Sequence, residues 1–201
     1  MSARLSPTDW CDAGLSLLRD EGMPALTIER LCAALGRTKG SFYHHFLDLN
    51  AFLAMLLSRW EDTLTEQPIA LAAAEANPRK RAARLDAAVV TLDHRLDLAV
   101  RAWGLWDGRA RAAIARVDAR RLAYLTDVFK ARGMERAKAL AQLEYVAFVG
   151  AQQLGASVEP ERAARLRSDV QRALAFAGRQ RLGRPRALQR RALASKTKTK
   201  A

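Results

Sequence analysis

The sequence predicts an all-α protein in which a small N-terminal unit that contains a helix-turn-helix precedes a larger helical domain. Strong helix formers, chiefly Ala, Leu and Arg, make up much of the 201 residues. No segment shows the period-two alternation that is typical of a half-buried strand. Capping residues also recur before apolar segments that end at Gly or Pro. Half of the residues are hydrophobic, which is enough to build a core.

The first helix is predicted to begin after Ser6. Ser6 can cap the helix, Pro7 suits the first helical position, and Asp9 stands where a capping-box acid belongs. Gly22 is expected to end this helix, because glycine is the common residue just after a helix.

Two short helices and a tight turn are expected over residues 27–46. Thr27 is expected to cap the first of them, Gly36 to end it, and Thr38 to begin the second. Phe42 and Phe46 are four residues apart, so both should point back into the small core. This arrangement predicts a helix-turn-helix, with Asp48 capping the helix that follows.

The later helices are expected after a less regular stretch from Glu66 to Pro78, which we interpret as the boundary between two helical regions. The predicted domains are residues 1–64 for DNA binding, 65–178 for effector binding and dimerisation, and 179–201 as a basic, disordered tail. Further helices are predicted at 78–91, 95–106, 109–132, 134–155 and 160–177.

The net charge of +13 suggests an anionic partner, but residues 179–201 carry nine basic residues and no acid. Because most of the excess charge lies in this tail, the net charge by itself does not indicate that the folded part binds DNA. The prediction of DNA binding therefore rests on the helix-turn-helix. No apolar window reaches the length of a membrane helix, and no signal-peptide core follows Met1, so we expect a cytoplasmic protein that has no membrane partner.

The second helix of the motif offers several polar side chains to DNA. A recognition helix presents its N-terminal residues to base edges in the major groove. Here those residues are Thr38, Lys39 and Ser41, with Tyr43 and His44 about one turn further on.

The run from Leu26 to Phe46, which contains Lys-Gly-Ser-Phe-Tyr-His-His-Phe, resembles the TetR family of bacterial regulators. The resemblance covers about residues 8–57 and extends to the rest of the chain in architecture alone. It implies a phosphate contact at the start of the first motif helix, recognition contacts, and clamps on the DNA backbone. The resemblance places the phosphate contact at Thr27. It places the recognition contacts at Lys39, Ser41 and His44, and the backbone clamps at Tyr43 and His45.

Three positions depart from the family pattern, and at one of them Leu35 stands where the family usually has Ala. Arg37 stands where the family usually has an apolar residue, and we expect it to face outward toward a phosphate. Leu49 replaces a lysine that is common at the start of the next helix, which removes one expected phosphate contact.

Aromatic residues mark the second domain, and two interpretations of them stay open. Trp103, Trp106, Tyr124 and Tyr145 could be ordinary core, or some of them could wall a small-molecule pocket in the region 80–155. Trp103 and Trp106 would share one helix face. For His94 a solvated or capping position is expected.

A homodimer is expected from the last two helices. The run 145–151 has no charge, and Val170, Leu174 and Phe176 supply further apolar positions. In the family that the sequence resembles, the last two helices pair across a two-fold axis, which matches binding to a palindromic operator.

The predicted function is therefore a sequence-specific transcriptional regulator, specifically a repressor that responds to an unidentified small molecule. The alternative is a non-specific or architectural DNA-binding protein that relies on its tail. No GxSxG, HExxH or P-loop occurs, so no catalytic residue is proposed and the protein is not expected to be an enzyme. Neither a metal site nor a cofactor is proposed, since the adjacent His44 and His45 point about 100° apart on a helix.

Overall fold

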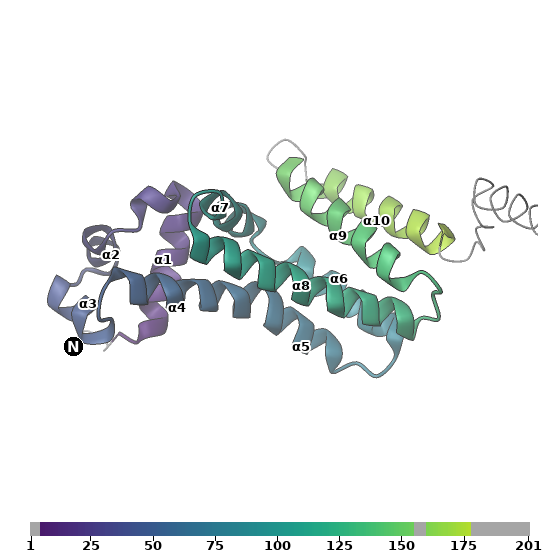
Figure 1. Ribbon diagram of the computed structural model, residues 1–201, viewed down its shortest axis with the longest axis horizontal. Helices are drawn as coiled ribbons and strands as arrows, with labels where there is room; N and C mark the ends of the chain where they lie inside the picture. Colours follow the sequence, from purple (N-terminus) through teal and green to yellow (C-terminus); the bar gives the residue numbers. More distant parts are fainter. Residues whose placement is uncertain (1–4, 155–159, 178–201) are drawn as a thin grey trace, which may run out of the picture.

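The computed structural model describes residues 5–154 and 160–177, and over these ranges it contains helices and no strand, which confirms the all-α prediction (Figure 1). The described helical segments are α1 (Pro7–Glu21), η1 (Met23–Ala25), α2 (Ile28–Leu35), α3 (Lys39–His45), α4 (Leu49–Glu61), η2 (Asp62–Glu66), α5 (Gln67–Ala73), α6 (Pro78–Val90), α7 (His94–Gly104), α8 (Gly108–Ala131), α9 (Ala137–Leu154) and α10 (Pro160–Ala177). Within the described ranges no helix is both long enough and apolar enough to cross a lipid bilayer. The predicted tail, 179–201, lies outside the described residues.

Local capping positions the N-terminal helices as the sequence predicts. Ser6 and Asp9 form a reciprocal capping box at α1. The side chains of Thr27 and Thr38 accept hydrogen bonds from backbone N–H groups three residues later, at 3.2 and 3.4 Å. Gly36 adopts the left-handed conformation, with φ +60°, that turns α2 toward α3.

The connection between α4 and α5 differs from the expected irregular stretch. The chain stays helical from Asp62 to Ala73, through the five-residue π-helical segment η2. Pro68 has no backbone N–H, so a regular α-helical hydrogen bond to the residue 64 carbonyl cannot form. The wider π turn carries the helix past this point, and the break falls instead at Ala74–Asn77, where Asn77 caps α6.

A single hydrophobic core joins the helix-turn-helix to the second part of the molecule. Helix α7 packs against α1, and α8 packs against α4. The core extends without a break through side chains of all these helices, which include Trp10, Phe42, Phe52, Leu56, Trp60, Val100, Trp103 and Val117. A displacement of α7 or α8 must therefore be transmitted to α1 and α4, because close-packed cores do not deform continuously.

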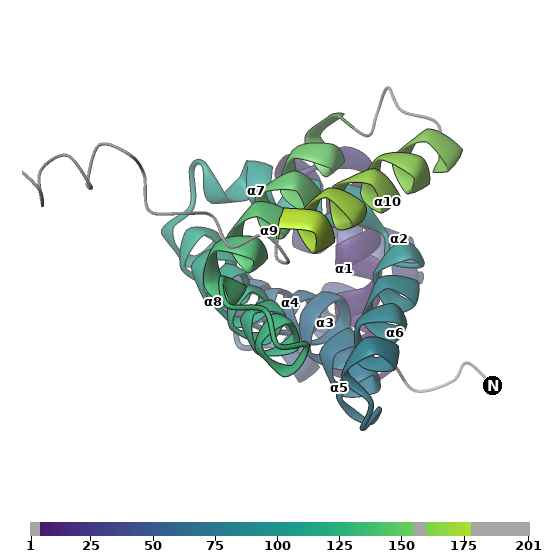
Figure 2. The ribbon, with the colours of Figure 1, turned by 90° about the vertical axis from the view of Figure 1, so that its right-hand side faces the viewer.

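A smaller core holds the far end together. Phe129 at the end of α8 packs with Leu140 of α9 and Leu174 of α10. Figure 2 shows α9 and α10 side by side, with α8 and the pair α5 and α6 on opposite sides below them. These helices surround the cavity described below.

Candidate DNA interface and ligand cavity

The recognition helix α3 is anchored by its aromatic face. Phe42 is fully buried, with its ring centroid 5.4 Å from Trp10 and 5.7 Å from Phe52. Phe46 is also buried and lies 5.2 Å from the Phe42 ring. Both phenylalanines point into the core as predicted, so the orientation of α3 is fixed by packing from α1 and α4.

The opposite face of α3 is exposed at one end of the molecule (Figure 1). Thr38, Lys39 and His44 are exposed, and the Tyr43 side chain keeps 54% of its surface in solvent. Ser41 is half-buried. Because Lys39 and Tyr43 are four residues apart on a helix, they lie on the same face, where a DNA groove could receive both.

Lys39 forms an ion pair with Glu29 of α2, with 2.5 Å between its Nζ and the carboxylate oxygen. This pair lowers the pKa of Glu29 and raises that of Lys39. Both side chains are more than half exposed, so the pair is weak and Lys39 can exchange Glu29 for a phosphate.

The remaining predicted contacts lie around the same helix. Thr27 is half-buried, and its hydroxyl serves as the cap of α2. His45 is half-buried, with its ring centroid 6.4 Å from Trp10, and it lies 5.0 Å from His44. Arg37 is half-buried in the turn. The structure therefore brings all eight predicted DNA-contacting residues to one end of the molecule, whereas their contacts with DNA remain a prediction.

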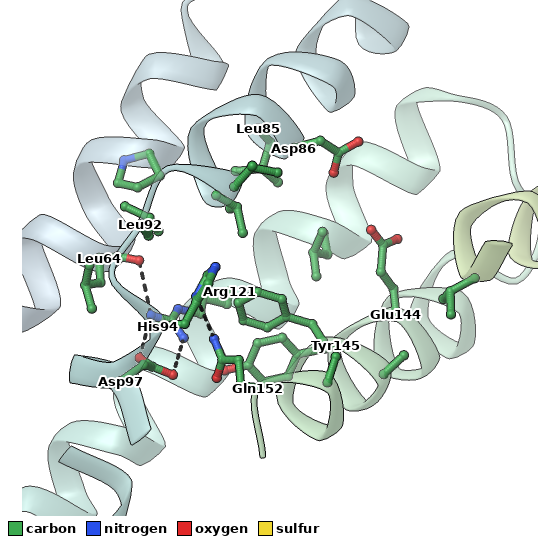
Figure 3. Close-up of a pocket in the computed structure, with 18 of the residues that line it drawn as sticks. Leu64, Leu85, Asp86, Leu92, His94, Asp97, Arg121, Glu144, Tyr145 and Gln152 are labelled. Atoms are coloured by element: carbon green, nitrogen blue, oxygen red, sulfur yellow. Dashed lines mark hydrogen bonds and ion pairs between the residues drawn. The ribbon is translucent and has the colours of Figure 1, made fainter. Parts of the chain in front are cut away.

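A cavity of about 500 Å³ lies in the second part of the molecule (Figure 3). Its wall is mostly apolar and comes from η2 and the helices α5, α6, α7, α8, α9 and α10, with Leu92 from the turn before α7. The apolar lining includes Leu64, Ile69, Leu85, Val89, Leu92, Leu125, Phe148 and Val170. This size and character are typical of small-molecule sites.

Two of the four aromatic residues proposed for the pocket line this cavity, Tyr124 and Tyr145. The other two placements are corrected, because Trp103 is buried in the main core and Trp106 is 88% exposed. Helix α7 ends at Gly104, where a Cβ would come within 2.4 Å of Ile114 on α8. The chain turns there, so Trp106 leaves the face that it would share with Trp103 in a longer helix.

His94 also departs from expectation. Asp93 caps α7, and His94 is half-buried on the cavity wall, with its Nδ1 3.1 Å from the Gln152 amide. Its ring centroid is 5.5 Å from that of Phe148. Contact with α9, which no local pattern reveals, accounts for this position.

A buried charged network forms one end of the cavity (Figure 3). Asp97 of α7 is 2% exposed and receives hydrogen bonds from Arg121, at 3.1 Å, and from Arg101, at 3.3 Å. Arg101 also donates to Asp118, and the Tyr145 hydroxyl donates to the same carboxylate at 2.5 Å. The network thus ties α7, α8 and α9 together around the cavity.

Two carboxylates face each other at the other end, Asp86 of α6 and Glu144 of α9 (Figure 3). Burial, and then the proximity of Asp86, raise the pKa of Glu144 to about 7. Neither residue belongs to a motif that the sequence reveals. The one available signal was that Glu144 directly precedes the uncharged run 145–151, which α9 has to bury in part.

The proposed dimer positions divide between two environments. Tyr145, Phe148 and Val170 line the cavity, and Leu174 is buried in the smaller core, so these four residues point inward. In contrast, Val146 and Phe176 are 69% and 60% exposed, and so is Leu143, which precedes the predicted run, at 56%. Leu143 and Val146, together with exposed Gly150, follow the i, i+3, i+7 spacing of one face of α9.

Comparisons with known proteins agree with this architecture. Residues 11–51 match the family model described as bacterial regulatory proteins, tetR family. No curated protein matches the chain in sequence.

Solved structures of regulators share the fold over most of the chain. A TetR transcription regulator from Haloarcula marismortui has 16% identity and a TM-score of 0.71, with 85% of this chain and 96% of that chain covered. Reduced NemR of E. coli has 20% identity and a TM-score of 0.69, with 82% and 95% covered. A transcriptional regulator from Saccharomonospora viridis, in complex with choline, has 16% identity and a TM-score of 0.69, with 82% and 93% covered.

The family model and the solved structures agree, the model through residues 11–51 and the structures through most of the chain. The helix-turn-helix unit over residues 11–51 is that of the TetR family of bacterial regulatory proteins, and the described chain has the fold of that family's transcriptional regulators.

Proposed function

We propose that the protein is a transcriptional repressor that binds a palindromic operator as a homodimer and releases it when a small molecule occupies the cavity. The observation that carries the proposal is the two-sided character of α3. Its aromatic side is locked into the core by Phe42, while Lys39, Tyr43 and His44 are exposed although they are not needed for folding. A rigid helix with an exposed polar face is what major-groove recognition requires.

The exposed apolar face of α9 supports the dimer. Leu143 and Val146 are large side chains that one protomer leaves in solvent, and Phe176 of α10 is a third. A second copy of the chain would cover this surface by an isologous contact, and its symmetry would match two operator half-sites.

Packing between the cavity wall and the helices that anchor α3 supports the response to a ligand. Arg121 on the cavity wall donates to the carbonyl of Leu64 and to the Thr65 hydroxyl, both in η2, which directly follows α4. Asp97, on the same wall, belongs to α7, which packs against α1. A ligand that binds one arrangement of these helices better than another would shift the spacing of the two recognition helices. The choline complex of the Saccharomonospora viridis regulator is consistent with small-molecule binding in such a fold.

Footprinting on the DNA upstream of the protein's own gene tests the proposal. We expect one protected site with two inverted half-sites about one or more helical turns apart, as symmetric dimers produce. A uniform protection pattern at every sequence would contradict specific regulation.

Such a pattern would support the alternative, an architectural protein whose basic tail does most of the binding. A chain that ends at Gly178 separates the two functions. For a regulator, truncation lowers affinity for operator and random DNA about equally, and the ratio between them is kept. For the architectural alternative, truncation abolishes binding to both.

A further inference from the structure

We propose that the cavity takes a mostly apolar molecule with one positively charged group, and that Glu144 and Asp86 receive this group. The inference deepens the proposed function, since it names the chemical class of the molecule that would release DNA. It concerns binding to the cavity alone and can be tested without DNA.

The apolar part of the ligand follows from the wall. Leucine, isoleucine, valine and phenylalanine side chains from six helical segments dominate the lining, and the volume of about 500 Å³ is that of a site for a drug-sized molecule. Burying apolar surface here contributes about 25 cal/mol per Å², which is enough to favour a hydrophobic skeleton.

The charge of the ligand follows from the distribution of ionic groups along the wall. Among the lining residues that the structure describes, Arg121 is the one arginine or lysine, and it is 3.1 Å from Asp97. Its guanidinium also donates to the Leu64 carbonyl and the Thr65 hydroxyl. With its charge compensated and its donors engaged, Arg121 offers little to an anionic ligand.

Glu144 at the opposite end has different surroundings. Asp86 of α6 faces it, the Gln171 side chain of α10 hydrogen-bonds to it, and Arg132 acts on it from the end of α8. The Arg132 guanidinium stands 5.6 Å over the ring of Phe129. Within the described ranges no cationic side chain forms an ion pair with Glu144.

A half-buried carboxylate beside a second carboxylate costs free energy until a cation arrives. Burial is the main cause of the raised pKa of Glu144, and Asp86 adds to it. A ligand ammonium group between the two carboxylates would compensate both effects, whereas a ligand carboxylate would increase them. The wall therefore selects for a cation by attraction and against an anion by repulsion.

Three probes of one skeleton test this inference: phenylbutylamine, phenylbutanol and phenylbutyrate, which are cationic, neutral and anionic at pH 7.5. Binding to the full chain is measured by calorimetry, with thermal shift as a second readout. We expect the amine to bind about tenfold more tightly than the alcohol, as a charge-assisted hydrogen bond implies, and the butyrate to bind most weakly.

Matched variants locate the charge recognition. Glu144→Gln and Asp86→Asn keep side-chain shape and should each reduce the preference for the amine over the alcohol several-fold, with circular dichroism unchanged. Glu135→Gln, at an exposed position just before α9, should leave the preference intact. If Glu144→Gln does not fold, the order of affinity of the three probes for the unchanged protein still tests the inference.

Equal or tighter binding of the alcohol or the butyrate would overturn the inference, as would binding of none of the three. An amine preference that survives both pocket variants would place the charge recognition elsewhere and overturn it as well. If the amine binds as expected but does not release operator DNA, the ligand class stands and the proposed regulation fails.

Discussion

The Arg121 guanidinium donates to the backbone carbonyl of Leu64 at 3.1 Å. This is the carbonyl that Pro68, lacking an N–H, cannot satisfy within a regular α-helix. Arg121 thus completes the hydrogen bonding where α4 passes through η2 into α5. Since it also pairs with Asp97, it connects the end of α4 to α7.

Replacing Arg121 should cost substantial stability. Arg121→Met leaves Asp97, which is 2% exposed, with Arg101 alone and should lower the free energy of unfolding by about 3–5 kcal/mol. Denaturant unfolding measures this. The control is Arg120→Met, since Arg120 forms an exposed pair with Glu66 that is worth at most about 1 kcal/mol. Equal losses in the two variants would show that the buried network is not a stabilising unit.

Substitutions on α3 should separate DNA binding from folding. Lys39→Ala, Tyr43→Ala and His44→Ala should each weaken operator binding by about 1–3 kcal/mol where a base contact is lost. The melting temperature should hardly change, because these side chains are exposed. Lys138→Ala, at an exposed position on α9, serves as the control in fluorescence titrations. Unchanged affinity in the triple variant would refute the recognition-helix assignment.

Glu29 should restrain DNA binding. It pairs with Lys39 and places a negative charge beside the expected phosphate contact. Glu29→Gln should therefore raise affinity for operator and random DNA alike, and the gain should shrink as salt is added. A titration across a salt series provides the measurement. A loss of affinity would mean that Glu29 is needed to position Lys39.

Two glycines should respond in opposite ways to alanine. A Cβ at Gly14 would lie 2.6 Å from Phe52 and 2.9 Å from Leu56, so Gly14→Ala should destabilise the fold by about 1–3 kcal/mol. At Gly40 the nearest atom is the Thr38 hydroxyl at 3.7 Å, so Gly40→Ala should stabilise α3 by about 0.5–1 kcal/mol. If α3 approaches the DNA backbone closely, Gly40→Ala still weakens operator binding. Thermal unfolding and DNA titration of both variants check these opposite outcomes.

The exposed face of α9 should control assembly. Val146→Arg places a charge in the centre of the proposed interface and should convert the dimer to a monomer in light scattering at micromolar concentration. Leu71→Arg is the matched control, since Leu71 is 49% exposed on α5, away from this face. A dimer that survives Val146→Arg would require another interface.

Glu144 should make stability depend on pH. Its pKa in the folded protein is raised to about 7 from the ordinary value of 4.5, so folding favours the protonated form. The stability that this preference confers is present below about pH 4.5 and is lost as pH rises through 7. Glu144→Gln should therefore be more stable than the unchanged protein at pH 8, by about 1–3 kcal/mol, and the difference should shrink at pH 5. Denaturant unfolding at the two pH values measures this, with Glu135→Gln as control. The same difference in the free energy of unfolding between Glu144→Gln and the unchanged protein at both pH values would contradict the prediction.

The sequence by itself determined the elements whose hydrogen bonds are local. Ser6, Thr27, Thr38 and Asp48 each cap a helix by accepting a hydrogen bond from a residue three positions later, so each start is encoded within a few residues. Gly36 likewise encodes the turn through its own backbone freedom.

Tertiary structure decided the burial and the surroundings of side chains that contact helices distant in the sequence. Trp103 and Trp106 have similar neighbours in sequence, yet one is buried in the core and the other is exposed, because α7 ends at Gly104, where it approaches α8 closely, and Trp106 lies beyond that end. Glu144 became a candidate ligand-binding residue because α6 brings Asp86 opposite it. The burial and electrostatic field of such a group depend on elements far away in the chain, which no local pattern of residues contains.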